Sequence, residues 1–99
     1  MKDVLLELIR KTSAFLPPDV EEAILSLSKL EEKNSMASFA MELVQKNSNL
    51  AKQRSLPICQ DTGTITFYVK KPKGFSEIEF KKEAEKAVEE ATKIGYLRQ

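Results

Sequence analysis

Four consecutive side chains near the middle of the chain offer different chemistry: a thiol, an amide, a carboxylate and a hydroxyl. They belong to Cys59, Gln60, Asp61 and Thr62. A thiolate is a soft metal ligand, and the other three groups can hydrogen-bond a polar ligand. Pro57 lacks an amide hydrogen and Gly63 tolerates a positive φ, so the two residues are typical of the ends of a short loop. We predict a site loop over residues 56–63, because binding groups are often carried on loops held by rigid elements.

Taken one at a time, these residues are not specific. A lone cysteine is most often a buried structural thiol, and a glutamine beside an aspartate is most often part of a solvated polar loop. An arginine near a chain end, such as Arg98, is ordinarily just exposed. The chain contains no histidine, which removes the commonest general base and the commonest zinc ligand.

The longer run LPICQDTGT, over residues 56–64, resembles a segment of the iron–sulfur hydro-lyases. This family comprises the class I fumarate hydratases and the alpha subunits of L(+)-tartrate dehydratase. The run Gly95-Tyr96-Leu97-Arg98 is similar to a second, shorter segment of the same family. The order and spacing of the two segments and the helical leader before them also fit, so the resemblance covers most of the chain.

This resemblance implies a role for each matching residue. Cys59 corresponds to one of three cysteines that hold a [4Fe-4S] cluster, in which the iron without a protein ligand binds the substrate as a Lewis acid. Gln60 and Asp61 correspond to residues that contact a dicarboxylate substrate, and Asp61 is the candidate catalytic residue for proton transfer. Arg98 corresponds to an arginine that binds a substrate carboxylate through two parallel contacts.

The reaction implied by the resemblance is the reversible hydration of a small dicarboxylate, either fumarate to malate or, in the dehydrating direction, tartrate to oxaloacetate. One thiolate cannot hold a cubane cluster, so the other ligands are expected from the remainder of the alpha subunit or from a separate polypeptide. A beta subunit or domain and an oligomeric assembly are further expected partners. We therefore expect residues 1–99 to form a single segment of a larger hydro-lyase domain that is inactive alone.

Apolar residues at helical spacing predict three helices within residues 1–55. A proline pair separates the first helix from the second, and Asp19 with Glu22 is typical of a capping box at the start of the second. Asn34 or Ser35 can cap the third helix. Asn47 interrupts the apolar stripe of that helix, and we expect it to face solvent rather than the site loop.

The residue pattern after the site loop predicts one strand followed by one helix. Residues 64–70 alternate between apolar and polar types that prefer strands, and residues 76–94 begin with a capping box at Ser76. Gly95 is expected as the left-handed C-cap of that helix. The predicted fold class is α+β, mainly α. Because a single strand is not a stable sheet, its partner strands are expected from the rest of the subunit.

Composition excludes several classes of protein. The 16 basic and 15 acidic side chains nearly cancel, which gives no electrostatic case for binding nucleic acid or an anionic membrane. No apolar run is long enough for a membrane span, the first residues do not resemble a signal peptide, and a single cysteine cannot form an internal disulfide. A cytoplasmic location is therefore expected.

Two alternatives remain open at this stage. Asp61-Thr62-Gly63-Thr64 also resembles the Asp-Thr-Gly signature of the aspartic proteases, which pair two aspartates, although that fold is almost entirely β. The chain could instead be a helical interaction module, or a truncated remnant that keeps the motif without the chemistry. A β-dominated structure would favour the protease. Co-expression with the rest of the subunit would test whether the chain is a remnant without activity.

Overall fold

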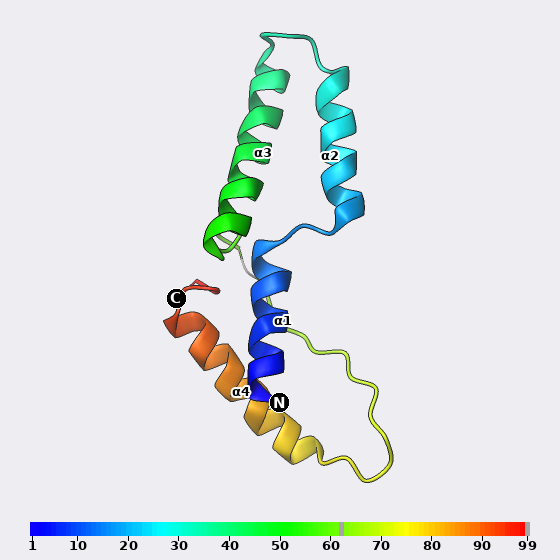
Figure 1. Cartoon of the computed structure of the whole chain (residues 1–99), viewed down its shortest axis with the longest axis vertical. Coiled ribbons are helices and arrows are strands. Elements are labelled where there is room, and N and C mark those ends of the chain that lie inside the picture. Colours follow the sequence, from blue (N-terminus) through cyan, green and yellow to red (C-terminus); the bar gives the residue numbers. More distant parts are fainter. Residues whose placement is uncertain (62, 99) are drawn as a thin grey trace.

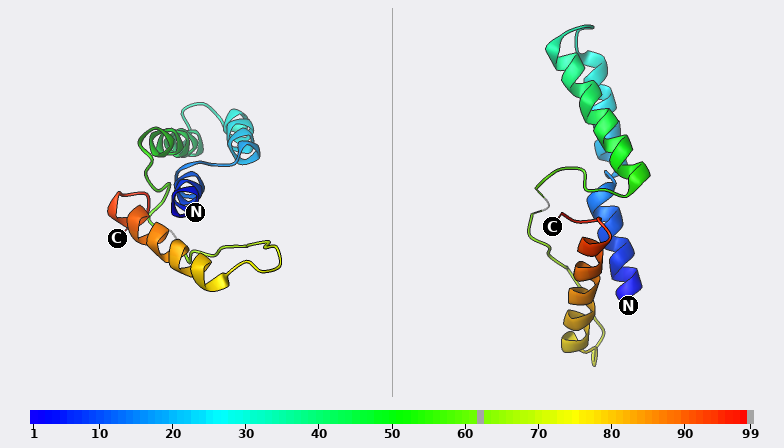
Figure 2. Two further views of the ribbon diagram at one scale, coloured as in Figure 1. Left: turned by 60° about the horizontal axis from the view of Figure 1, so that its bottom comes forward. Right: turned by 90° about the vertical axis from the view of Figure 1, so that its left-hand side faces the viewer.

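The computed structural model describes residues 1–61 and 63–98, and this part of the chain is mainly helical. Four helices follow one another along the chain: α1 (Lys2–Ala14), α2 (Pro18–Leu30), α3 (Met36–Arg54) and α4 (Glu77–Lys93). Helices α2 and α3 lie side by side and antiparallel at one end of an elongated molecule, while α1 packs against α4 at the other end (Figures 1 and 2). None of the four helices combines the length and the apolar character needed to cross a lipid bilayer.

The helix ends follow local sequence signals, with one exception. The Ser35 hydroxyl accepts a hydrogen bond from the Ser38 N–H at 3.0 Å, and the Ser76 hydroxyl accepts one from the Glu79 N–H at 3.2 Å, so both predicted caps are confirmed. The prediction that Asp19 caps α2 is wrong. This helix begins at Pro18, whose fixed φ suits the first helical position, and Asp19 lies within the first turn near the positive end of the helix dipole.

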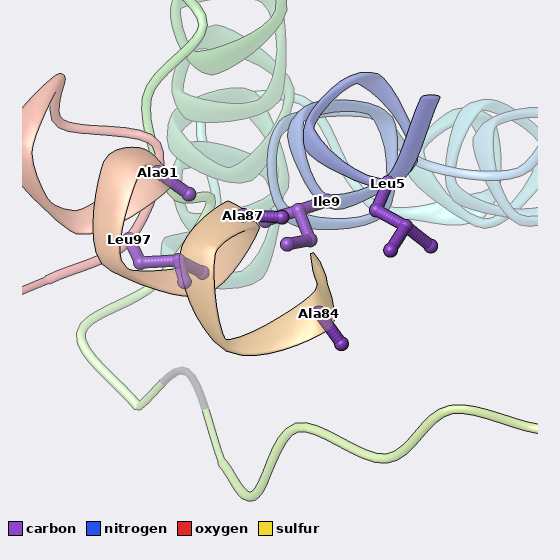
Figure 3. Packing of buried hydrophobic residues seen from close by; sticks show 6 residues of the cluster. All are labelled: Leu5, Ile9, Ala84, Ala87, Ala91 and Leu97. Carbon is purple, nitrogen blue, oxygen red and sulfur yellow. The ribbon is translucent and has the colours of Figure 1, made fainter. Parts of the chain in front are cut away.

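The buried core lies between α1 and α4. Two large side chains of α1, Leu5 and Ile9, pack against a face of α4 made of small residues (Figure 3). The other members of this cluster are Ala84, Ala87, Ala91 and Leu97. Because alanine leaves room for the neighbouring backbone, the two helices approach closely, and each large side chain buried in this way contributes about 1.5–3 kcal/mol to folding.

The predicted strand over residues 64–70 is wrong. No part of residues 63–76 is assigned to a strand, and residues 64–70 make no backbone hydrogen bond to another described segment. A strand needs a neighbour to complete its ladder of hydrogen bonds, and the described part of the chain offers none. The mainly helical part of the predicted fold class is therefore confirmed, while its β component is not found in residues 1–61 and 63–98.

Among residues 64–70, Phe67 alone is not exposed. The Phe67 ring is half-buried and meets the Phe80 ring edge-on, with 5.9 Å between the ring centroids. Tyr68, the next residue along, is 95% exposed. The ring centroids of Phe75 and Phe80 lie 6.3 Å apart across the start of α4, as expected for a hydrophobic staple. The aromatic contacts therefore fasten this long connection to α4 without any sheet.

Candidate functional site

The segment that carries Cys59 starts where α3 ends. Ser55 adopts the left-handed conformation with φ of 53° and ends the helix, and the Leu56 N–H donates back to the Ala51 carbonyl at 3.1 Å. The chain then turns toward α1, where the Ile58 N–H donates to the Ser13 carbonyl at 3.0 Å. Ser13 lies in the last turn of α1, whose carbonyl groups have no partner within the helix. The loop therefore supplies a hydrogen-bond donor to a carbonyl at the C-terminal end of α1.

Cys59 and Asp61 lie at the surface and share a small pocket. Their side chains line a cavity of about 190 Å³ whose other lining residues are Thr12, Ser13, Pro57 and Ile58. The Cys59 thiol is exposed and donates to the backbone carbonyl of Asp61 at 3.1 Å. One oxygen of the Asp61 carboxylate, Oδ1, accepts a hydrogen bond from the Gly63 N–H at 2.9 Å, which orients the carboxylate. The pocket is thus bordered both by the residue that carries the thiol and by the residue that carries the carboxylate.

The positive φ of Gly63 is what allows this turn. Gly63 has φ of 65°, a conformation in which a side chain would be strained, and nothing lies within 4 Å of the position a Cβ would take. A substitution here would therefore act through backbone strain rather than through a steric clash. Thr62, the fourth residue of the chemical run, lies outside the described residues.

The two other predicted site residues are less closely connected with this pocket. Gln60 is exposed and is not among the residues that line it. Arg98 is also exposed, and it follows Leu97, which is buried in the core between α1 and α4. Leu97 lines an adjoining cavity of about 240 Å³ that shares Thr12 and Ser13 with the Cys59 pocket. The structure thus places the residue before the arginine at an adjoining cavity, and Arg98 itself does not line the Cys59 pocket.

The donor set fits one ligand position of an iron–sulfur cluster. Within residues 1–61 and 63–98 no three Cys, His, Asp or Glu side chains gather in a way that could hold a metal ion. Cys59 is nevertheless exposed and lines a cavity, and a cysteine sulfur is the ligand that such clusters use. The site therefore fits a cluster held jointly with cysteines outside this set, and it does not fit a cluster held by this chain alone.

Two residues that hold the loop were not assigned to it from the sequence. The prediction that Asn47 faces solvent rather than the site loop is wrong, because Asn47 is exposed but its side-chain amide donates to the Ile58 carbonyl of the loop at 2.7 Å. The Arg10 guanidinium donates to the Ser55 hydroxyl at 3.1 Å and lies over the Phe15 ring, 5.1 Å from its centroid. The only signal for Asn47 was that it interrupts an apolar stripe, and nothing in the sequence singled out Arg10.

Arg10 also carries a carboxylate partner on its own helix. Its Nε donates to a Glu7 carboxylate oxygen at 2.9 Å. This hydrogen bond lowers the pKa of Glu7 below its ordinary value and raises the pKa of Arg10. Arg10 is therefore held by one residue of α1 while it reaches the end of α3.

Comparisons with known proteins point to one family of hydro-lyases. The family model described as fumarate hydratase (Fumerase) matches residues 2–99. A relative in Geobacillus stearothermophilus, provisionally named fumarate hydratase class I, is 40% identical over 92 residues, which are 93% of this chain and 18% of that protein. A relative in Methanocaldococcus jannaschii, provisionally named L(+)-tartrate dehydratase subunit alpha, is 30% identical over 101 residues, covering 99% of this chain and 35% of that protein.

The chain belongs to the fumarate hydratase (Fumerase) family, and the resemblance drawn from residues 56–64 and 95–98 is confirmed. It spans 18% and 35% of the lengths of these two relatives. The aspartic protease alternative is wrong, because family membership and a mainly helical fold in the described residues both contradict a β-dominated protease.

Proposed function

We propose that this chain contributes residues to the active site of a [4Fe-4S]-dependent hydro-lyase that adds water to, or removes it from, a small dicarboxylate. The candidate substrate pairs are fumarate with malate and tartrate with oxaloacetate. Family membership supports the class of reaction. The observation that carries the assignment to residues is the exposed thiol of Cys59 beside the carboxylate of Asp61 in one pocket.

Cys59 is the proposed cluster ligand of this chain. When bound, the cluster supplies a Lewis acid that polarises the substrate's hydroxyl and carboxylate groups. The thiol donates to a backbone carbonyl two residues along the chain, in an exposed loop, so ligation would replace a single hydrogen bond at the surface. Ligation by Cys59 therefore requires no rearrangement of the core between α1 and α4.

Asp61 is the proposed proton-transfer group. Its Oδ1 atom is held by the Gly63 N–H, so the carboxylate has a defined orientation beside the thiol. The proton it would move is on the carbon next to a substrate carboxylate, which that carboxylate acidifies. Gln60 would hydrogen-bond the substrate through its exposed amide, and Arg98 would bind a substrate carboxylate.

The proposed assembly includes the remainder of an alpha subunit, a beta subunit or domain, and further copies in an oligomer. The name of the M. jannaschii relative, a subunit alpha, supports a partner subunit. The remaining cluster cysteines are assigned to this assembly, since one thiolate holds only one corner of a cubane. We place the enzyme in the cytoplasm, where thiols stay reduced and an exposed cysteine remains available to iron.

Co-production with the remaining alpha and beta polypeptides, followed by anaerobic iron–sulfur reconstitution, tests this proposal. We expect brown protein with hydratase activity, and we expect Cys59→Ser to lose both because a hydroxyl is a poor ligand for iron in such a cluster. Ser26→Ala is the matched control, since Ser26 is exposed on α2, away from the Cys59 pocket. Full activity and colour in the Cys59→Ser protein would contradict the assignment.

The runner-up function is a non-catalytic helical interaction module, or a remnant without chemistry. It is supported by the apolar side chains that α2 and α3 leave exposed, which include Leu27, Leu30, Met36 and Phe39. The reconstitution separates the two functions. A complex that forms with its partner polypeptides but stays colourless and inactive in the wild-type form would favour the module.

A further inference from the structure

Two helices hold Ile58, the residue just before Cys59, through its backbone N–H and its backbone C=O. The Ile58 N–H donates to the Ser13 carbonyl of α1 at 3.0 Å, and the Ile58 carbonyl accepts from the Asn47 side-chain amide of α3 at 2.7 Å. We propose that Asn47 is a positioning residue that, together with the Ser13 carbonyl, fixes Cys59 beside its pocket. For its consequence in catalysis this inference rests on the proposed function, while the clamp itself is a property of the chain.

The pair of bonds is effective because of its geometry. The Ile58 N–H belongs to the Pro57–Ile58 peptide unit and the Ile58 C=O belongs to the Ile58–Cys59 peptide unit, so the two bonds hold two consecutive peptide planes. The Cα of Cys59 lies in the second plane, whose carbonyl accepts from Asn47. Loss of the Asn47 bond therefore frees the plane that contains the atom from which the thiol projects.

Further contacts join the two helices that carry the anchors. Arg10 of α1 donates to the Ser55 hydroxyl at the end of α3, and its guanidinium lies over the Phe15 ring. The Lys52 ammonium of α3 lies over the same ring, 5.6 Å from its centroid. These contacts join the end of α1 to the end of α3, so the helices that carry Ser13 and Asn47 are connected beside the loop.

The clamp also shapes the pocket. Ser13 and Ile58, two of the three clamped residues, line the same cavity of about 190 Å³ as Cys59 and Asp61. When the Asn47 bond is absent, the backbone of Ile58 keeps only its bond to Ser13 within the described part of the chain. We therefore expect the positions of the thiol and the carboxylate to become less defined, without loss of either group.

The test uses amide hydrogen exchange of the 99-residue chain, measured by NMR, in Asn47→Ala and in the control Asn49→Ala. Both substitutions replace asparagine by alanine on α3, so their effects on helix propensity match, and Asn49 makes no side-chain hydrogen bond within the described part of the chain. We expect exchange of the Ile58 amide to become roughly three- to tenfold faster in Asn47→Ala only, since one net hydrogen bond is lost. Exchange at Ala87 in the core should not change.

A second variant, Asn47→Asp, separates the hydrogen bond from the shape of the side chain. At neutral pH the carboxylate cannot donate, so Ile58 should exchange faster than in the wild-type chain. Below the pKa of an aspartate, about 4, the carboxyl group regains an O–H donor and the difference from the wild type at the same pH should shrink. Equal exchange at Ile58 in all variants, or equal acceleration at Ile58 and Ala87, would overturn the proposal.

The assembled enzyme then connects the clamp with the site. We expect Asn47→Ala to take up the cluster but lose it several-fold faster to an iron chelator than Asn49→Ala does, because one ligand is held less firmly. Equal rates of loss in the two variants would overturn the link to the site. A wild-type assembly without any cluster would contradict the proposed function and leave the exchange result unaffected, so the two failures are distinguishable.

Discussion

The two ends of the molecule are built differently. At one end, α1 and α4 share a buried cluster in which Ala87 and Ala91 are fully covered. At the other end, α2 has no buried residue and α3 buries only Ala51 (Figure 1). Most of the stability therefore comes from the α1–α4 pair, while the α2–α3 pair presents apolar surface. The Cys59 loop lies at the junction and is bonded to α1 and α3, so its geometry depends on both ends.

The largest expected difference between the two ends is the cost of truncating an apolar side chain. Ile9→Ala, at a position 6% exposed, should lower the free energy of unfolding by about 2–4 kcal/mol because it leaves a cavity against α4. Leu27→Ala on α2, at a position 56% exposed, should change it by less than about 0.5 kcal/mol. Urea denaturation followed by circular dichroism measures both. Similar losses in the two variants would show that α2–α3 carries its own core.

A smaller effect is expected at the joint between the two ends, where Arg10 bridges α1 and Ser55. The hydrogen bond from Arg10 lowers the pKa of Glu7 in the folded chain from its ordinary value of 4.5. A carboxylate whose pKa is lowered by folding stabilises the fold above its unfolded pKa, and the contribution is lost as the pH falls through the folded pKa. Glu7→Gln should therefore be slightly less stable than the wild type at pH 7.

The pH dependence of the stability difference between the wild type and Glu7→Gln makes this test specific to the charge of Glu7. The difference between the wild type and Glu7→Gln should disappear well below pH 4.5, when Glu7 itself is protonated. Because the pair is exposed to solvent, the effect should also weaken with added salt. Urea midpoints at several pH values measure it, and a difference that persists unchanged in acid would show that Glu7 acts by packing and not by charge.

The local part of the fold could be predicted from the sequence. Caps at Ser35 and Ser76 and a left-handed glycine at 95 are decided within a few residues, and all three are observed. The strand could not be predicted correctly, because alternation shows what a segment can do when a neighbouring strand is present, and none is present among the described residues. The misplaced cap at Asp19 has a local cause, since Pro18 is itself a good first residue of a helix.

The candidate residues of the site could be named from the sequence, but the residues that support the loop could not. The run over residues 56–64, with residues 95–98, indicated the family and the candidate site residues, and the structure places Cys59 and Asp61 at one pocket. The roles of Cys59, Gln60, Asp61 and Arg98 stay predictions. Asn47 lies 11 positions before Ile58, and its hydrogen bond depends on how the loop folds back over α3, which no local pattern contains.

The most direct test of the central claim measures colour and turnover together in the reconstituted assembly with Asp61→Asn and Cys59→Ser. If the two residues serve one site in different roles, Asp61→Asn should keep the brown cluster and lose about 10²–10⁴-fold in turnover, as expected for removal of a proton-transfer group. Cys59→Ser should lose both. Full turnover in Asp61→Asn, or retained colour and turnover in Cys59→Ser, would contradict the account.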